Sequence, residues 1–250
     1  MSNPVDEMTK RMLEDAGIRP GMRVLDIGCG PGWVSFMLAQ RVGKEGHVYG
    51  VDRDPRMLEL ARQKARDTGV KNVTFLEGGF DVSFPERGTL DAVVGRRVLM
   101  YQPNAVQAIA QLADVIRPGG VIAFHEHDMV TADDGRTSLP LHDRVRSWLR
   151  DMLRAEGANL HMGFDLHSAL TAAGLIVERV RAEANVLTPT ASYPIGAIIR
   201  AVLPRLLQHG IVTEAEVNVE TLDDRLTAER REANATCIWE MVFCAWARKQ

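Results

Sequence analysis

Short apolar segments that alternate with turns and helical patterns fill the first half of the chain. Strands are predicted at residues 23–27, 47–51, 73–76, 90–94 and 121–124, and helices at residues 33–42, 54–69 and 104–116. Such short, nearly continuous apolar strands are typical of a parallel sheet that helices cover on both faces. The sequence therefore predicts an open, doubly wound α/β sheet, a class that binds ligands at the carboxyl ends of its strands.

A glycine-rich turn, DIGCGPG at residues 26–32, follows the first predicted strand. Glycines at such a position permit positive φ angles and let a ligand approach the backbone closely, although a tight turn that only packs well is the alternative for the glycines alone. Asp52 ends the second predicted strand, twenty residues beyond Gly32, where an acid can bind the ribose hydroxyls of a nucleoside. The spacing therefore indicates a cofactor of the adenosine type.

Asp26 narrows the choice of cofactor. NAD would place a pyrophosphate at this turn, and a carboxylate would repel it by about 1 to 4 kcal/mol at a distance of about 4 Å. S-adenosylmethionine carries an ammonium and a sulfonium instead, and no phosphate. The glycine spacing is G-x-G-x-G, which differs from the G-x-G-x-x-G fingerprint of dinucleotide-binding proteins. We therefore expect S-adenosyl-L-methionine as the cofactor and S-adenosyl-L-homocysteine as its product.

The composition argues against several other classes of protein. The chain has 250 residues, 46% of them hydrophobic, and a formal net charge of −3, without the basic runs that bind nucleic acid. It shows neither an apolar signal-peptide segment nor a run long enough to span a membrane. Its three cysteines lack the CxxC spacing of a zinc site. We expect a cytoplasmic protein that binds neither nucleic acid nor a membrane; a homodimer is compatible with the sequence, which does not define the oligomeric state.

Four segments resemble, in order and spacing, the class I S-adenosylmethionine-dependent methyltransferases. They are VLDIGCGPG at 24–32, GVD at 50–52, LDAVV at 90–94 and IRPGG at 116–120. They correspond to motif I, the ribose-binding strand end, the fourth strand and the turn into the fifth strand. The resemblance points to the ubiquinone and menaquinone C-methyltransferase branch, which also includes many natural-product enzymes.

The resemblance implies a Rossmann-like fold with a mostly parallel, seven-stranded sheet and a helical lid insertion. It implies one methyltransferase domain over residues 1–250, in which residues 20–128 bind the cofactor and residues 129–250 form the substrate side. It also implies that the last strand, predicted at residues 236–247, is antiparallel in the sheet.

The resemblance also assigns roles to residues by position. The glycine turn would hold the methionine part of the cofactor, Asp52 the ribose hydroxyls, and Met57 would lie beside the adenine. Gly79 stands where the family usually has an aspartate on the adenine amine, so Phe80 is expected to present its backbone to the adenine and Asp81 to replace the missing acid. The expected cofactor-binding residues are Asp26, Gly28, Cys29, Gly30, Gly32, Asp52, Arg53, Met57, Gly79, Phe80, Asp81, Gly95 and Arg96.

The second half of the chain resembles the family only loosely. Two helical patterns, at residues 194–210 and 213–231, lie between predicted strands at 175–182 and 236–247. Long insertions in compact domains are often lids or binding loops. We therefore expect residues 192–231 to form a lid over the substrate, with a purely structural insertion as the alternative.

The fifth predicted strand leads into a polar cluster, HEHD at residues 125–128. Strand alternation puts His125 and His127 on one face and splits them from Glu126 and Asp128, which disfavours a metal site. The two remaining roles are structural hydrogen bonding, and orientation or deprotonation of a substrate. We expect the latter, with His127 and His125 as catalytic residues and no metal. The residues expected to border the substrate are Trp33, Tyr101, Trp148 and His161.

These expectations combine into one leading function, methyl transfer from S-adenosylmethionine to a small-molecule acceptor, with secondary metabolism as one setting. The transfer needs orientation of donor and acceptor, and a base only if the acceptor must lose a proton. A protein or RNA methyltransferase is one alternative. A second is an S-adenosylmethionine-binding protein with other chemistry, such as a cyclase or a decarboxylase. A nicotinamide-dependent oxidoreductase is the third, which Asp26 and the glycine spacing disfavour.

Overall fold

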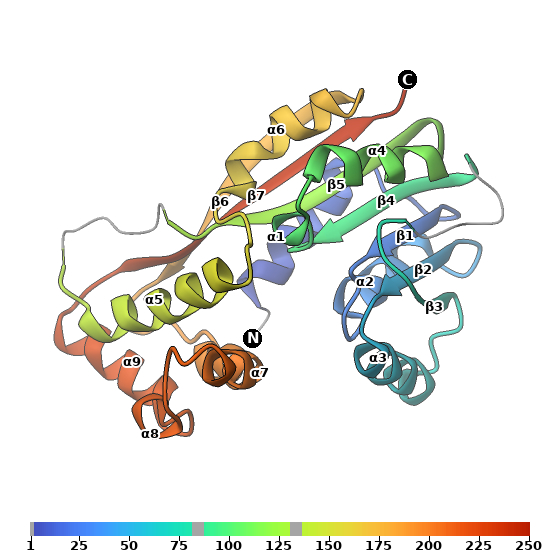
Figure 1. Ribbon diagram of the computed structural model, residues 1–250. Helices are drawn as coiled ribbons and strands as arrows, with labels where there is room; N and C mark the ends of the chain where they lie inside the picture. Colours follow the sequence, from blue (N-terminus) through green and yellow to red (C-terminus); the bar gives the residue numbers. More distant parts are fainter. Residues whose placement is uncertain (1–2, 82–87, 131–136) are drawn as a thin grey trace. The chain divides into compact units, whose positions relative to one another are not determined.

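The computed structural model describes residues 3–81, 88–130 and 137–250 (Figure 1). Within these ranges seven strands form one sheet, in the order β3-β2-β1-β4-β5-β7-β6. Strands β1 to β5 pair in parallel, and helices flank the sheet. The predicted doubly wound, mostly parallel, Rossmann-like α/β fold is therefore confirmed.

The carboxyl ends of neighbouring strands meet at one edge of the sheet. The strands are β1 (Arg23–Ile27), β2 (His47–Asp52), β3 (Val73–Glu77), β4 (Leu90–Arg96), β5 (Ile116–Asp128), β6 (Ile176–Leu187) and β7 (Cys237–Arg248). The helices are α1 (Pro4–Asp15), α2 (Trp33–Val42), α3 (Pro55–Thr68), the 3₁₀ helix η1 (Leu99–Tyr101), α4 (Ala105–Val115), α5 (Pro140–Ala155), α6 (Met162–Ala172), α7 (Ile195–Gln208), α8 (Glu214–Val217) and α9 (Leu222–Glu232). The register aligns Ile27 at the end of β1 with Val51 of β2 and Gly95 of β4.

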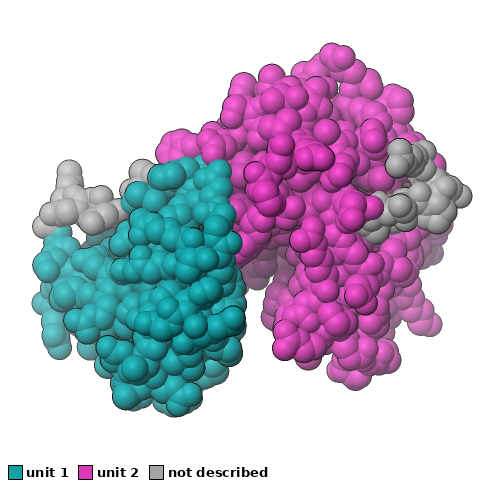
Figure 2. Space-filling model, viewed as in Figure 1, with its two compact units in different colours: residues 1, 127–161, 183–242 teal, residues 2–126, 162–182, 243–250 magenta. Residues whose placement is uncertain are grey.

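The chain divides into two compact units, which Figure 2 colours separately. Unit 1 comprises residues 127–161 and 183–242, and unit 2 comprises residues 2–126, 162–182 and 243–250. Strands β5, β6 and β7 contribute residues to both units. The division follows packing rather than chain order, because each unit combines segments that are distant in the sequence.

Helix α3 shows how local sequence sets the helix ends in unit 2. The Asp54 side chain accepts the N–H of Arg56 at the N-terminus, and Pro55 occupies the first helical position. Gly69 ends the helix in a left-handed conformation, with a φ of 68°. Both predicted ends of this helix are confirmed. Asp52, the last residue of β2, therefore stands just before the turn that leads into α3.

Helix α1 was not predicted, although Asn3, Pro4 and the helical spacing of its apolar residues are helix signals. Its inner face buries Val5, Met8, Met12 and Leu13, and Asn3 caps its first turn. Full burial of each large apolar side chain is worth about 1.5–3 kcal/mol. Tertiary packing of this inner face therefore stabilises the helix.

Strand β5 is longer than predicted at both ends. Its pairing with β4 starts at Ile116, shifts register at an irregularity and resumes at Val121. The IRPGG segment at 116–120 therefore lies within the strand rather than in a separate turn. At the other end the strand continues to Asp128, so the polar cluster at 125–128 is part of a regular strand.

In unit 1, helices α5, α7 and α9 pack against one another. Glu229 of α9 accepts two backbone N–H groups at the start of α5 and bonds to Nδ1 of His142. Arg230 is 2% exposed and donates to the carbonyls of Thr188 and Ala191. These bonds attach the start of α5 and the segment after β6 to α9.

The helical pattern predicted at residues 213–231 is interrupted. Thr213 and Glu216 form a capping box at the start of α8, in which each side chain bonds to the other residue's backbone. Asn218 then adopts a left-handed conformation, with a φ of 41°, and ends α8. Asparagine enters this region more readily than most residues, so one asparagine is enough to separate α8 from α9.

Candidate active site

The glycine turn between β1 and α2 has the backbone that its sequence predicts. Gly28, Gly30 and Gly32 have φ angles of 66°, 51° and 84°. A Cβ on Gly28 would lie 2.3 Å from Cγ1 of Val98, so a side chain does not fit there, whereas a Cβ on Gly30 would meet nothing within 4 Å. Gly30 therefore leaves open space beside the backbone, as a ligand-binding turn requires.

Asp52, at the end of β2, holds this turn in place. Its Oδ2 accepts the N–H of Gly30 at 2.7 Å, and its Oδ1 accepts the N–H of Asp54 at 2.9 Å. A carboxylate has about four acceptor positions, so these two hydrogen bonds leave capacity for ligand hydroxyls. The acid and the glycine turn, which the sequence places twenty residues apart, are thus in direct contact.

Asp26 is buried behind the turn, with 1% of its surface exposed. The hydroxyl of Ser35 donates to its Oδ2 at 2.5 Å. Burial raises the pKa of Asp26 to about 7, although the Ser35 hydrogen bond and the positive charge of Arg96 both lower it. The acid therefore titrates near neutral pH, where a nearby cation would favour its ionised form.

A cavity of about 270 Å³ opens at the carboxyl ends of β1 and β2. Five of the expected cofactor-binding residues line it, namely Gly28, Asp52, Arg53, Gly79 and Phe80. Tyr101, which was expected to border the substrate, also lines it and is 42% exposed. Sequence reasoning missed the other described lining residues, which are Ile27, Gly78, Arg97, Val98 and Gln102. The cavity thus combines an acid, a glycine-rich backbone and two aromatic rings.

Gly79 leaves room for an arginine. A Cβ at position 79 would lie 2.6 Å from Nε of Arg53 and 3.1 Å from Oδ1 of Asp81. The arginine side chain therefore lies against the position where a side chain at residue 79 would begin, and Asp81 lies beside it. This crowding is a physical reason for the glycine, and the role of Asp81 toward an adenine stays a prediction.

The segment after β4 forms one wall of the cavity. Arg97 has a φ of 59°, which is uncommon for a residue with a side chain and recurs at functional sites. Its N–H donates to the carbonyl of His125 at 2.9 Å. Glu126 Oε1 accepts the N–H groups of Val98 and Leu99, both at 2.8 Å. Two consecutive residues of β5 thereby fix this wall.

Glu126 is a buried acid that the sequence analysis does not place in the site. Burial raises its pKa to about 7, although the backbone N–H groups that it accepts favour the ionised form. Its Oε2 has no hydrogen-bond partner among the described residues. Strand alternation could not predict that Glu126 fixes this wall, because its partners Val98 and Leu99 follow another strand, β4.

Helix α1 is attached to the ends of β4 and β5 within unit 2. Nδ1 of His125 lies 3.0 Å from the hydroxyl of Thr9 in α1, and His125 is fully buried. Arg96 forms an ion pair with Asp6 of α1 at 2.7 Å and also bonds to Thr9. The side chain of Arg96 therefore faces α1, and it acts on Asp26 only through its charge.

The last two residues of the polar cluster have partners in unit 1. Nδ1 of His127 lies 3.0 Å from Oε2 of Glu240 in β7. Oδ2 of Asp128 lies 2.7 Å from Nδ1 of His161. The side chain of His161 is 56% exposed, whereas the other three side chains are buried. Sequence reasoning missed Glu240, because nothing local marks an acid in the last strand as the partner of a histidine in β5.

The remaining expected site residues lie outside the described lining of this cavity. Met57 is partly buried on α3, and Trp33 is 55% exposed with the Nζ of Lys64 3.4 Å from its ring centre. A Cβ on Gly95 would lie 2.6 Å from a phenylalanine ring of β5, so the glycine makes room for this ring, and its role toward the cofactor stays a prediction. Trp148 is buried in unit 1. Cys29 is also buried, and burial raises the pKa of its thiol, so it is no reactive cysteine.

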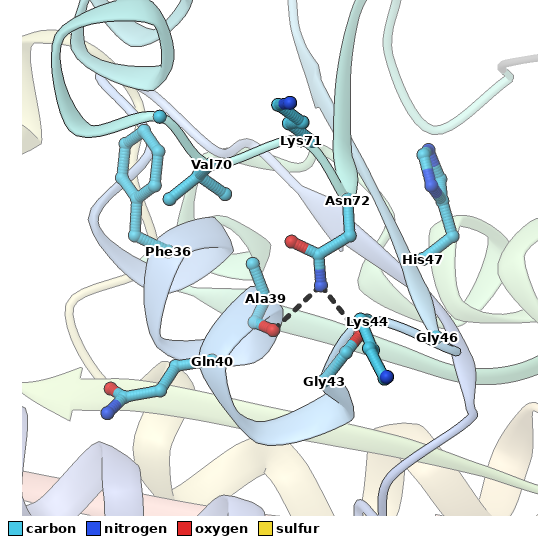
Figure 3. A pocket seen from close by; sticks show the side chains of 11 residues that line it. Phe36, Ala39, Gln40, Gly43, Lys44, Gly46, His47, Val70, Lys71 and Asn72 are labelled. Atoms are coloured by element: carbon cyan, nitrogen blue, oxygen red, sulfur yellow. Dashed lines mark hydrogen bonds between the residues drawn. The ribbon is translucent and has the colours of Figure 1, made fainter.

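Another cavity, of about 740 Å³, lies at the opposite edge of the sheet (Figure 3). It includes His47, which begins β2, and Asn72, which precedes β3. The Asn72 amide donates to the carbonyls of Ala39 and Gly43, both at 2.8 Å, and so caps the end of α2. Because ligands of this fold class bind at the carboxyl ends of the strands, we take the smaller cavity as the candidate site.

In residues 3–81, 88–130 and 137–250, no group of three or more His, Cys, Asp or Glu side chains is arranged to hold a metal ion. No helix in the same ranges is long and apolar enough to cross a bilayer.

Known proteins that resemble this chain include two methyltransferases. A family model described as a methyltransferase domain matches residues 18–184. The aklanonic acid methyltransferase DauC of Streptomyces sp. is 39% identical over 118 residues, covering 47% of this chain and 53% of that protein. The protein-L-isoaspartate O-methyltransferase of Pyrococcus horikoshii is 34% identical over 147 residues, covering 55% of this chain and 63% of that protein. The chain therefore matches less than two thirds of the length of each relative.

A solved structure is similar over nearly the whole chain. The YcgJ protein of Bacillus subtilis superposes with a TM-score of 0.63 at 17% identity, covering 98% of this chain and 99% of the other. At this identity the similarity concerns the fold. It supports the arrangement of strands and flanking helices described above.

Proposed function

Since the chain belongs to the family of methyltransferase domains, we propose that it transfers a methyl group from S-adenosylmethionine to a small-molecule acceptor. The matched segment contains the glycine turn, Asp52 and the described lining of the candidate cavity. The relative DauC is named for a small organic acid, which supports a small acceptor. Secondary metabolism is the setting that we propose for it.

The proposal rests on one observation. Asp52 contacts the glycine turn, and the buried acid Asp26 lies behind this turn. Asp52 retains acceptor capacity for ribose hydroxyls while it holds Gly30. Asp26 lies behind the same turn and titrates near neutral pH, so the cationic methionine end of a cofactor would favour its ionised form. A dinucleotide would instead bring its pyrophosphate to this turn, and the carboxylate would repel it.

The residues of the chain would bind and orient the donor. S-adenosylmethionine supplies a methyl group that its sulfonium charge has already activated. Asp52 takes the ribose hydroxyls, the glycine turn lies along the methionine part, and Phe80 presents its backbone to the adenine, with Asp81 and Met57 nearby. Orientation is the main contribution of the protein, since well-placed reactants gain roughly 7–11 kcal/mol over freely diffusing ones.

We assign the acceptor side of the reaction to residues 129–250, with residues 192–231 as its lid. Helix α7 has an apolar inner face, and none of the described residues that line the cofactor cavity comes from this insertion. His127 and His125 are the proposed catalytic residues, and His127 is preferred because it lies nearer the end of β5. Trp148 and His161 stay predicted acceptor residues.

The test is transfer of label from methyl-labelled S-adenosylmethionine. We expect the purified protein to label compounds in a low-molecular-weight metabolite extract, and mass spectrometry identifies the product. Label that enters only proteins would favour a protein methyltransferase, the second candidate, which the match to the isoaspartate enzyme supports. Binding of the cofactor without any labelled product would indicate other chemistry. A cytoplasmic location, and action without nucleic acid or membrane, stay predictions.

A further inference from the structure

The segment that follows β4 and forms one wall of the candidate cavity is attached to β5 through three consecutive backbone N–H groups. The N–H of Arg97 donates to the carbonyl of His125 at 2.9 Å. The N–H groups of Val98 and Leu99 both donate to Oε1 of Glu126, each at 2.8 Å. These residues and the described lining of the cavity all belong to unit 2. The position of the wall therefore depends on a strand that contributes no residue to the described lining.

The backbone of this wall needs such support. Arg97 has a φ of 59°, and a residue with a side chain keeps this conformation only where its surroundings hold it. The carbonyl of Val98 in turn accepts the N–H of Tyr101 at 3.3 Å and the side-chain amide of Gln102 at 3.5 Å. All four residues line the cavity. A displacement of Val98 would therefore move the rest of the wall with it.

The side chain of Val98 also lies against the glycine turn. A Cβ on Gly28 would lie 2.3 Å from Cγ1 of Val98, and a Cβ on Gly95 would lie 2.8 Å from Cγ2. The register of β1 and β4 pairs Gly95 with Ile27, the residue before Gly28. The two methyl groups of Val98 thus occupy the space that two glycines on neighbouring strands leave. The wall and the glycine turn are in contact through this one side chain.

Glu126 is fully buried, although burial of a carboxyl group is costly. Burial raises its pKa to about 7, and the bonds to the wall and the positive charge of Arg97 lower it. Both the ionised and the neutral acid have an oxygen that can accept the N–H groups of Val98 and Leu99. The wall therefore requires an acceptor oxygen at residue 126 rather than a negative charge.

We infer that Glu126 is a positioning residue for the methyl donor, because it holds Val98 and Leu99 where the wall and the glycine turn together form the donor site. The inference rests on the proposed function. Glu126 acts through Val98 and is not part of the described lining. Without its acceptor oxygen the wall would adopt other arrangements as well. The affinity for the donor would then fall in proportion to the fraction of molecules that keep the binding arrangement.

The first test is amide hydrogen exchange in the protein without any ligand, measured residue by residue by NMR. In the wild type we expect slow exchange at Val98 and Leu99. In Glu126→Met, which keeps the length of the side chain and removes both oxygens, exchange at these amides should approach that of unprotected amides. Tyr101 should lose protection as well, because its N–H bonds to the wall itself. Rapid exchange of Val98 and Leu99 in the wild type would overturn the inference.

The second test is the affinity for S-adenosylhomocysteine, measured by calorimetry on folded protein. If the binding arrangement becomes a minor state of about 1–10%, Glu126→Met lowers the affinity by about 10–10²-fold. Glu126→Gln keeps a carbonyl oxygen for both N–H groups, so its affinity should stay within about threefold of the wild type. Wild-type affinity in Glu126→Met, or an equal loss in Glu126→Gln and Glu126→Met, would overturn the inference.

Asn72→Ala is the matched control for a general loss of stability. It also removes a side chain that makes two hydrogen bonds to the backbone, at the opposite edge of the sheet. Urea unfolding should show that both Asn72→Ala and Glu126→Met are destabilised, whereas only Glu126→Met should lose affinity. A similar loss of affinity in Asn72→Ala would make Glu126 a merely structural residue and refute the positioning role.

Glu126→Asp is the second variant and covers the case in which Glu126→Met does not fold. Its carboxyl group is one methylene shorter, so it keeps the charge but does not reach both N–H groups without movement of the wall. We expect faster exchange at Val98 and Leu99 and a lower affinity than in Glu126→Gln; the reverse order would refute the inference. A wild type that does not bind S-adenosylhomocysteine would instead refute the proposed function, and the exchange measurement would still report whether Glu126 holds the wall.

Discussion

At the scale of single residues, Asp52 carries the proposed cofactor site. We predict that Asp52→Ala lowers the affinity for S-adenosylhomocysteine by about 10²–10⁴-fold, because two charge-assisted hydrogen bonds of about 1.5–3 kcal/mol each are lost. Isothermal titration calorimetry measures this loss. The matched variant Asp54→Ala removes an acid two residues away that caps α3 and pairs with Arg56, and it should leave the affinity nearly unchanged. Equal affinity in wild type and Asp52→Ala would contradict the ribose role.

The buried carboxyl of Asp26 leads to a prediction about how the affinity for the ligand depends on pH. Its pKa is raised to about 7 without ligand, so below pH 7 the protonated form prevails and a cationic ligand must displace the proton. The affinity for S-adenosylhomocysteine should therefore rise as the pH rises toward 7, by up to about tenfold per pH unit, and level off above it. Adenosine, which lacks the ammonium group, serves as the control and should show no such rise. A flat or falling affinity for S-adenosylhomocysteine would contradict the role of Asp26.

The cofactor residues that could be predicted are those whose role follows from backbone and spacing. Gly28, Gly30 and Asp52 could be recognised from the sequence. A positive φ angle favours glycine, and the acid stands at the end of a short strand. Arg97 and Glu240 could not be found in this way. The positive φ of Arg97 and the contact of Glu240 with His127 arise from tertiary packing, which leaves no local signature in the sequence.

At the scale of secondary-structure elements, Asn72 joins the end of α2 to the start of β3. Its amide makes two hydrogen bonds to carbonyls at the end of the helix (Figure 3). We predict that Asn72→Ala lowers the free energy of unfolding by about 1–3 kcal/mol, at about 0.5–1.5 kcal/mol for each bond. Urea unfolding measures the change. The affinity for S-adenosylhomocysteine should stay within about twofold, since Asn72 is remote from the candidate cavity; a large loss of affinity would argue against that cavity as the cofactor site.

The second prediction at this scale concerns the helical insertion. Replacing residues 192–231 by a short Gly/Ser linker should spare the binding of S-adenosylhomocysteine and abolish transfer to the acceptor. The reason is that the described lining of the candidate cavity comes from residues 27–102 alone. Calorimetry checks the binding, and the label assay checks the transfer. Normal turnover in the truncated protein would show that the insertion is no lid.

Most elements of the first half could be predicted because their limits are set locally. Strand Arg23–Ile27 and helix Trp33–Val42 have the predicted bounds, since glycines stand at the turn between them and at the end of the helix. Helix α1 was missed, although Asn3 before Pro4 and the helical spacing of Val5, Met8 and Met12 are local helix signals. The break at Asn218 could not be predicted from the helical pattern at 213–231, because one left-handed asparagine does not disturb the periodicity of the apolar residues.

At the scale of the whole molecule, the two compact units were not foreseeable from composition. Three limits of the units fall within strands β5, β6 and β7, and a further one lies between residues 161 and 162, where α6 begins. Linkers rich in glycine, proline or polar residues mark boundaries that lie between elements, and a boundary inside continuous strands has no such signal. The sequence predicts the fold of the chain through its alternating strands and helices, and the grouping of residues into units depends on packing.

Cofactor binding by the intact chain tests the central claim most directly. Isothermal titration of the wild-type protein with S-adenosylhomocysteine, S-adenosylmethionine and NAD compares the three ligands under one condition. The account predicts binding of the first two at one site per chain and no measurable binding of NAD, because Asp26 lies behind the turn that a pyrophosphate would occupy. Measurable binding of NAD together with no binding of S-adenosylhomocysteine would contradict it.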